Sequence, residues 1–126
     1  MMAKHFTIAI FCVSCLALVG CADNSPDGLM KQQIGLMNEL STVFETIKDV
    51  PSAEAAAPKI QAIGQRKKAL DLKFGELKLS PEEQGKLTER HRAGVIAAGE
   101  RLFKSRPKNA QILRNEKFSK AFESAR

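Results

Sequence analysis

Three cysteines, Cys12, Cys15 and Cys21, are the side chains of this 126-residue chain whose spacing most directly suggests chemistry. Cys12 and Cys15 have the CxxC spacing of redox-active dithiols. Both lie, however, inside an apolar run over residues 6–19, which follows a short start with one fixed positive charge. A charged start, a 7–15-residue apolar segment and a small residue before the exit describe a secretory signal peptide. We therefore expect residues 1–20 to be removed, and the CxxC pair with them.

Cys21 directly follows Leu18, Val19 and Gly20. These four residues resemble the lipobox of bacterial lipoproteins, in which a leucine, a small or branched residue and a glycine or alanine precede the cysteine. The resemblance implies that the Cys21 thiol receives a diacylglyceryl group, that cleavage occurs before it, and that the new amino terminus is acylated. Two acyl chains hold a protein stably at a membrane, whereas one holds it only marginally. The alternative is an ordinary signal peptide followed by a coincidental cysteine.

The apolar run is too short to be a membrane-spanning helix, since a bilayer core of about 30 Å needs about 20 apolar residues. In enterobacterial lipoproteins an aspartate directly after the lipidated cysteine favours the inner membrane; here Ala22 takes that place and Asp23 comes one position later. By that resemblance we expect the outer membrane, on the side facing the periplasm. The stretch over residues 36–64 is also similar to small uncharacterised helical lipoproteins of planctomycete-type bacteria.

His91 is the one histidine after Cys21, and it has no carboxylate or second histidine one turn away on its own helix. A helical His/Glu metal site is therefore absent from that segment, and a structural histidine is expected. Glu82 and Glu83 are interpreted as charges at a helix start rather than as a catalytic pair. No nucleophile elbow, P-loop or dinucleotide fingerprint occurs. We predict no catalytic residue, no metal, no cofactor and no enzymatic activity.

Charge is distributed unevenly along the chain. Residues 22–58 hold two lysines against six acidic residues, a net charge of −4, whereas residues 59–126 hold 17 Lys and Arg against eight, a net charge of +9. This asymmetry indicates an anionic partner or complementarity between the halves, the alternative being a solvated surface. Export argues against nucleic acid. The candidate contacts near the C-terminal end are Arg101, Lys104, Arg106, Lys108, Arg114, Lys117 and Lys120.

Apolar residues recur at helical rather than alternating spacing, which predicts an all-α fold. We expect a first helix over about 27–48, capped by Ser25 or Asp27, and a second over about 52–77. Pro58 predicts either a kink or a start near Ala57. The second helix carries an a/d-type seam in which one member is charged. Its residues are Ile60, Ile63, Lys67, Leu70, Phe74 and Leu77.

Ser80 and Glu83 predict a capping box at the start of a third helix, which should end near Lys104. Its inner face is expected to be thin, with small residues that allow close approach of a neighbour. A last segment over about 109–124 should place Phe118 and Phe122, extended by Leu113 and Ala121, against the bundle. The alternative is that this basic helix lies on an anionic membrane. The inner face of the third helix comprises Leu87, His91, Gly94, Val95, Ala98 and Leu102.

Together these patterns predict a small antiparallel helical bundle of three longer helices and a short C-terminal one. The expected organisation is a signal peptide at 1–20, a lipidated cysteine and polar tether at 21–27, and a helical domain at 28–126. The predicted function is a membrane-anchored, non-catalytic interaction or structural module. A binder of anionic envelope polymers or lipids, acting through the basic C-terminal half, is the alternative. The a/d seams are compatible with a monomer or a dimer.

Overall fold

A computed structural model describes residues 23–126, and this part of the chain is entirely helical, without a strand. Three long helices and two short ones follow one another, which confirms the predicted all-α fold. The predicted signal peptide and Cys21 lie outside the described residues. The helices are α2 (Pro26–Glu45), α3 (Val50–Leu77), α4 (Pro81–Ser105), α5 (Ala110–Arg114) and α6 (Glu116–Ser124).

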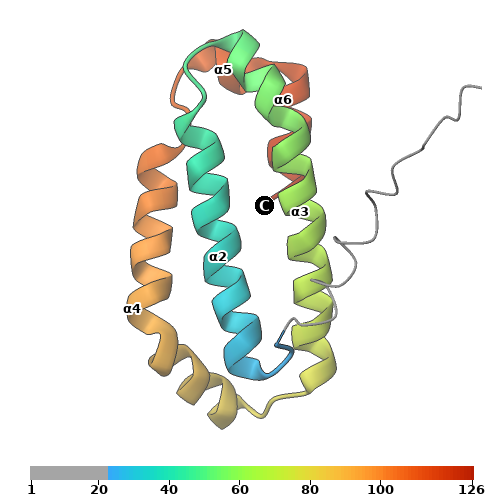
Figure 1. The fold of residues 1–126 in the computed structure, drawn as a ribbon, viewed down its shortest axis with the longest axis vertical. Coiled ribbons are helices and arrows are strands. Elements are labelled where there is room, and N and C mark those ends of the chain that lie inside the picture. Colours follow the sequence, from blue (N-terminus) through green and yellow to red (C-terminus); the bar gives the residue numbers. More distant parts are fainter. Residues whose placement is uncertain (1–22) are drawn as a thin grey trace, which may run out of the picture.

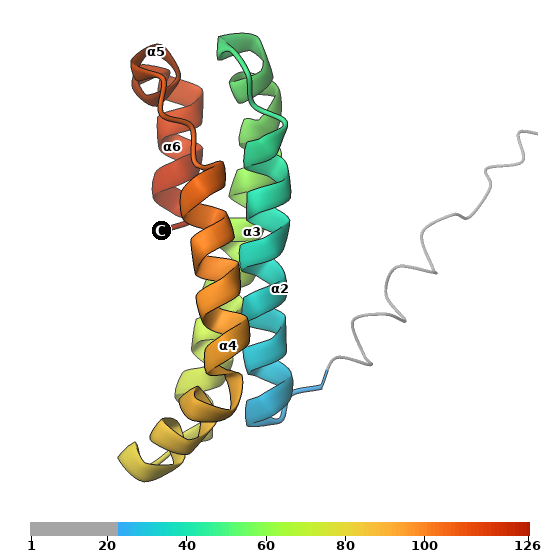
Figure 2. The same ribbon diagram turned by 90° about the vertical axis from the view of Figure 1, so that its left-hand side faces the viewer.

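Helix α2 packs against both α3 and α4 (Figures 1 and 2). Successive long helices run antiparallel, as predicted, but α4 lies along α2, to which it is parallel, and its backbone does not pack closely on that of α3. The short α6 packs on α3 and runs back from the end of the bundle where α2 meets α3. It covers only that half of the bundle. The arrangement is thus a four-helix bundle whose fourth position is half filled.

Helix starts follow the local capping residues. Ser25, one of two candidates, caps α2, and its Oγ accepts a hydrogen bond from the backbone N–H of Gly28 at 3.1 Å. At α4 the predicted capping box is confirmed. The Glu83 N–H donates to Ser80 Oγ at 3.2 Å, and the Ser80 N–H donates to Glu83 Oε2 at 2.9 Å. These hydrogen bonds satisfy backbone donors that a helix start leaves without a partner.

The second long helix begins earlier than predicted. Asp49 caps α3 at Val50: its Oδ1 accepts from the Ser52 N–H at 2.9 Å, while Ser52 Oγ accepts from the Asp49 N–H at 3.0 Å. Pro58 lies inside the continuous helix, so a start near Ala57 is wrong. The alanine-rich turns before Pro58 are stabilised as helix because three of their side chains are buried in the core. These are Ala53, Ala56 and Ala57.

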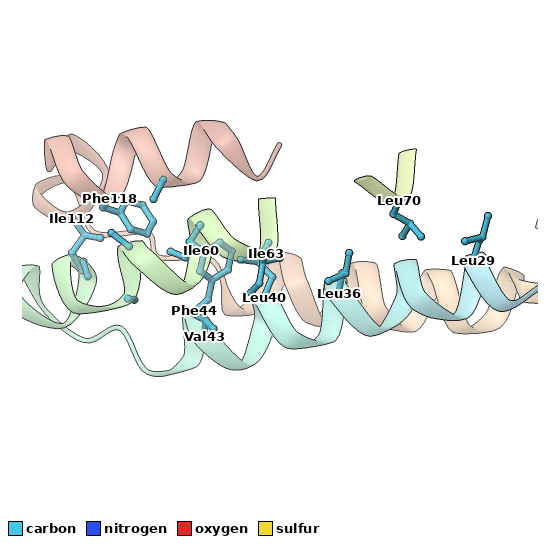
Figure 3. Close-up of a cluster of buried hydrophobic side chains, with 14 residues drawn as sticks. Leu29, Leu36, Leu40, Val43, Phe44, Ile60, Ile63, Leu70, Ile112 and Phe118 are labelled. Atoms are coloured by element: carbon cyan, nitrogen blue, oxygen red, sulfur yellow. The ribbon is translucent and has the colours of Figure 1, made fainter. Parts of the chain in front are cut away.

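Most of the core lies beneath α5 and α6, at one end of the bundle (Figure 3). There Phe44 of α2, Ile60 of α3 and Phe118 of α6 are each at most 2% exposed. Leu36, Leu70 and Leu29 lie beyond the end of α6 in the same figure, more widely spaced. The predicted α3 seam is confirmed, and Lys67 places its Nζ outside it, 3.0 Å from Asp71 Oδ2. The core is therefore dense where α6 covers it and thin elsewhere.

The C-terminal segment is two helices rather than the predicted one. Asn115 interrupts it in an extended conformation, donating from Nδ2 to Glu54 Oε1 at 2.9 Å and accepting the Phe118 N–H at 3.0 Å. The break changes which side chain faces inward. Ile112 is 3% exposed, whereas Leu113, predicted on the inner face, is 43% exposed. Docking of α6 on the bundle is confirmed, since Phe118 and Ala121 are buried there.

Candidate functional site

The cations predicted to contact an anionic partner gather at one end of the bundle, on the last turns of α4, on α5 and α6 and on the segment between α4 and α5. This end, which we call the basic end, lies opposite the start of α2 (Figure 1). Because α2 has 20 residues, it separates the two ends by about 30 Å at 1.5 Å per residue. The basic end comprises Arg101, Lys104, Arg106, Lys108, Arg114, Lys117 and Lys120.

Arg101 and Arg106 both make contacts between helices through their guanidinium groups. Arg101 holds α4 against α2, with Nε 3.1 Å from Glu45 Oε1 and Nη2 3.2 Å from Glu45 Oε2. Its Nη2 also donates to Thr42 Oγ1 at 3.0 Å. The Arg106 Cζ lies 5.1 Å from the centre of the Phe122 ring, a cation–π contact that covers α6. Arg101 therefore cannot bind an anion without loosening the contact between α4 and α2, whereas the ring contact of Arg106 uses the face of its guanidinium and leaves the N–H donors at its edge available.

The lysines of the basic end are more available. Lys120 Nζ lies 2.8 Å from Glu116 Oε1, and this hydrogen bond lowers the pKa of Glu116 and raises the pKa of Lys120. Lys117 Nζ lies 3.8 Å from Glu54 Oε2. Such exposed pairs contribute little stability, so an anionic ligand can compete for them. Within residues 23–126, Lys104, Lys108 and Arg114 form no ion pair.

At the opposite end, Asp23 is bound to the first turns of α2. The Ser25 N–H donates to Asp23 Oδ1 at 2.9 Å, and Gln32 Nε2 donates to the Asp23 carbonyl at 2.7 Å. The hydrogen bonds from Ser25 lower the pKa of the Asp23 carboxyl. Pro26 and Asp27, expected in the tether, belong to α2. Asp23, two residues after Cys21 in sequence, is therefore attached to the start of the bundle.

Asp27 joins α2 to α4 through a contact that the sequence reasoning missed. His91 Nε2 lies 2.7 Å from Asp27 Oδ1, and Arg90 donates from Nε to the same oxygen and from Nη2 to Oδ2, each at 3.2 Å. An ionised carboxylate only accepts, so Nε2 carries the proton. The side chain of His91 is 14% exposed. Asp27 lies 64 residues before His91 in sequence. The neighbours of His91 on its own helix therefore gave no indication of this partner.

No family model, curated protein or solved structure matches this chain. Across residues 23–126 no three His, Cys, Asp or Glu side chains gather closely enough to hold a metal ion. In the same range, every helix is too short or too polar to cross a membrane. The proposed function is therefore argued from the residues of this chain.

Substitution Asp27→Asn is expected to destabilise the fold in a pH-dependent way. The hydrogen bond from His91, followed by that from Arg90, lowers the pKa of Asp27. A carboxyl whose pKa is lower in the folded state stabilises the fold above its ordinary pKa, near 4, and loses that contribution as the pH falls through its folded-state value. Urea unfolding at pH 7 and pH 2 should therefore show a difference between parent and variant at pH 7 that is smaller at pH 2. An equal difference at both pH values would contradict this assignment.

Proposed function

We propose that this protein is a bacterial lipoprotein: acyl chains on Cys21 anchor it to a membrane, and its helical bundle is a non-catalytic interaction module. The observation that carries the proposal is the motif Leu18-Val19-Gly20-Cys21 at the end of the apolar run. The position of Asp23 supports it, because the bundle begins directly after the motif. By the resemblance to enterobacterial lipoproteins, the site of action is the periplasmic face of the outer membrane.

A short tether defines how the bundle would be presented. The two steps from Cys21 to Asp23 span at most about 7 Å of extended chain. The start of α2 would then lie next to the membrane, and the basic end would project away from it by the length of α2, about 30 Å. Confinement near a surface raises the effective concentration of the module for a neighbouring partner.

The second candidate function, binding of an anionic envelope polymer, is favoured by the unpaired cations of the basic end. Lys104, Lys108 and Arg114 are available, and three acidic groups of this end, Glu45, Glu54 and Glu116, are engaged with other side chains. Because this end lies opposite the tether, its target would be a polymer or acidic protein beyond the anchoring membrane. The lipids of that membrane would be out of reach.

The substitution Cys21→Ala tests the anchor. We expect the parent to stay with the membrane fraction after a wash in high salt and the variant to appear in the soluble fraction, because the variant has no thiol to acylate. Cys15→Ala is the matched control, since it removes a thiol inside the predicted signal peptide and should leave anchoring intact.

The wash separates the two candidate functions. A Cys21→Ala variant that stays with membranes in low salt and is released by high salt is held by charge, since exposed electrostatic contacts are screened by salt. That outcome would favour the binder of an anionic envelope polymer. If the Cys21→Ala variant stayed in the membrane fraction through both washes as firmly as the parent, the proposed lipid anchor would be contradicted.

A further inference from the structure

The half of the bundle that α6 leaves uncovered contains an apolar groove. Its floor is α2 and its walls are α3 and α4, whose backbones do not pack closely on each other. Two adjoining cavities of about 220 and 250 Å³ form it, and Gln33 lines both. The upper cavity begins beneath Ala125, directly after α6. The lower cavity ends at Leu79, in the connection between α3 and α4.

The lining of this groove is apolar and adaptable, with one charged group. Met37 and Leu102 line the upper cavity, and Met30 and Phe74 line the lower one; all four side chains are partly exposed. Methionine side chains adjust to ligands of irregular shape. Among the residues lining the two cavities Lys67 alone is charged, and its ammonium pairs only with the exposed Asp71. The remaining polar lining groups are the neutral side chains of Gln33, Gln84 and Thr88.

The dimensions of the groove match one acyl chain. Along α2 it extends from Leu40 to Met30, ten residues or about 15 Å of helix. One leaflet of a bilayer, which is one acyl chain deep, is half of a hydrocarbon core of about 30 Å. An apolar cavity of about 150 Å³ holds a benzene ring, so two larger cavities have room for a chain of roughly 16 carbons. A second helix, at least about 10 Å across, would not fit in them.

We propose that this groove binds a single long-chain fatty acid, with its carboxylate at Lys67 and its tail along Met30 and Phe74 toward Leu79. The charge of the lining selects this occupant: one cation lies at one end, and no other charge lines the path of the tail. The ion pair between Lys67 and Asp71 is exposed and contributes little stability, so the Lys67 ammonium can bind the carboxylate of the fatty acid instead. The site does not depend on acylation of Cys21.

Displacement of a fluorescent long-chain fatty acid by palmitate tests the site, with the full chain carrying Cys21→Ala so that no covalent acyl chain competes. We expect palmitate to displace the probe and hexadecyltrimethylammonium, which has the same tail and a cationic head, to bind at least tenfold more weakly. Gln33→Glu, which places a negative charge where the cavities meet, should weaken palmitate binding at least tenfold. Gln65→Glu, the same change on the exposed side of α3, should leave it unchanged.

Lys67→Gln should abolish the preference for palmitate over the cationic amphiphile. Circular dichroism and thermal melting establish that each variant is folded, and Thr88→Glu on the α4 wall replaces Gln33→Glu if that variant is not. Absence of displacement overturns the proposal, as does parental palmitate binding by the folded groove variant or an undiminished preference in Lys67→Gln. Release of Cys21→Ala from membranes is measured separately, so failure of the groove and failure of the anchor are distinguishable.

Discussion

Replacing Phe118 by alanine is expected to lower the free energy of unfolding by about 3–5 kcal/mol, the range for deletion of a buried phenylalanine side chain. Phe118 is 1% exposed and joins α6 to the rest of the bundle. Its ring centre lies 6.4 Å from that of Phe44 on α2 and 5.9 Å from that of Phe122. A nine-residue helix is not stable alone. The variant should therefore lose the docking of α6 as well as stability.

Urea unfolding followed by circular dichroism measures this loss. Phe103→Ala is the matched control, because Phe103 lies on α4 with 67% of its surface exposed. A surface substitution of this kind usually changes stability by no more than about 0.5 kcal/mol. Similar losses in both variants would show that α6 is not held by the burial of Phe118.

Gly64→Ala is expected to destabilise the protein by about 1–3 kcal/mol, the usual cost of overpacking. A Cβ on Gly64 would meet the backbone carbonyl oxygen of Ser124, at the end of α6, 2.5 Å away. Backbone atoms cannot move aside as a flexible side chain can, so the end of α6 would be displaced from α3. The direction is informative, because replacing glycine by alanine inside a helix ordinarily stabilises it by about 0.5–1 kcal/mol.

Gly35→Ala provides the comparison. Gly35 also lies inside a long helix, and a Cβ there would meet nothing within 4 Å. Thermal melts of the two variants should therefore move in opposite directions, upward for Gly35→Ala and downward for Gly64→Ala. A rise for both would contradict the close approach of α6 to α3.

Features that depend on neighbours in sequence were predictable. The capping box of Ser80 and Glu83 uses two residues three positions apart, so its pattern is visible before any fold is known. The α3 seam follows from helical periodicity, and Ile60, Ile63 and Leu70 are indeed buried. The early start of α3 was also encoded locally, by Asp49 and Ser52. Pro58 lies inside the helix, and its usual effect of breaking helices favoured a later start near Ala57 in the prediction.

The break at Asn115 was not predictable from periodicity. Asn115 caps α6 with one side-chain atom and reaches Glu54 on α3 with another. The second bond spans 61 residues and exists only because α5 and α6 fold back onto α3. The break also explains why Ile112 and not Leu113 faces the core. A break in the helix rotates the residues before it relative to those after it.

The candidate sites divide in the same way. The motif ending at Cys21 is a linear pattern and stays a prediction, as does the anionic partner of the basic end. The availability of each cation was a tertiary property: Arg101 is engaged by Glu45, 56 residues away, while Lys108 has no such partner within residues 23–126. His91 likewise acquired Asp27 from another helix.

By itself, the sequence determined that the chain is helical, which residues cap α4, and which faces of the long helices are apolar. These properties follow from interactions within about one helical turn. Only the tertiary structure decided that α4 packs along α2, that α6 covers half of the bundle, and that an apolar groove with Lys67 as its one cation remains beside it. These properties depend on contacts between residues dozens of positions apart, whose pairing is decided by how whole helices bury their apolar faces together.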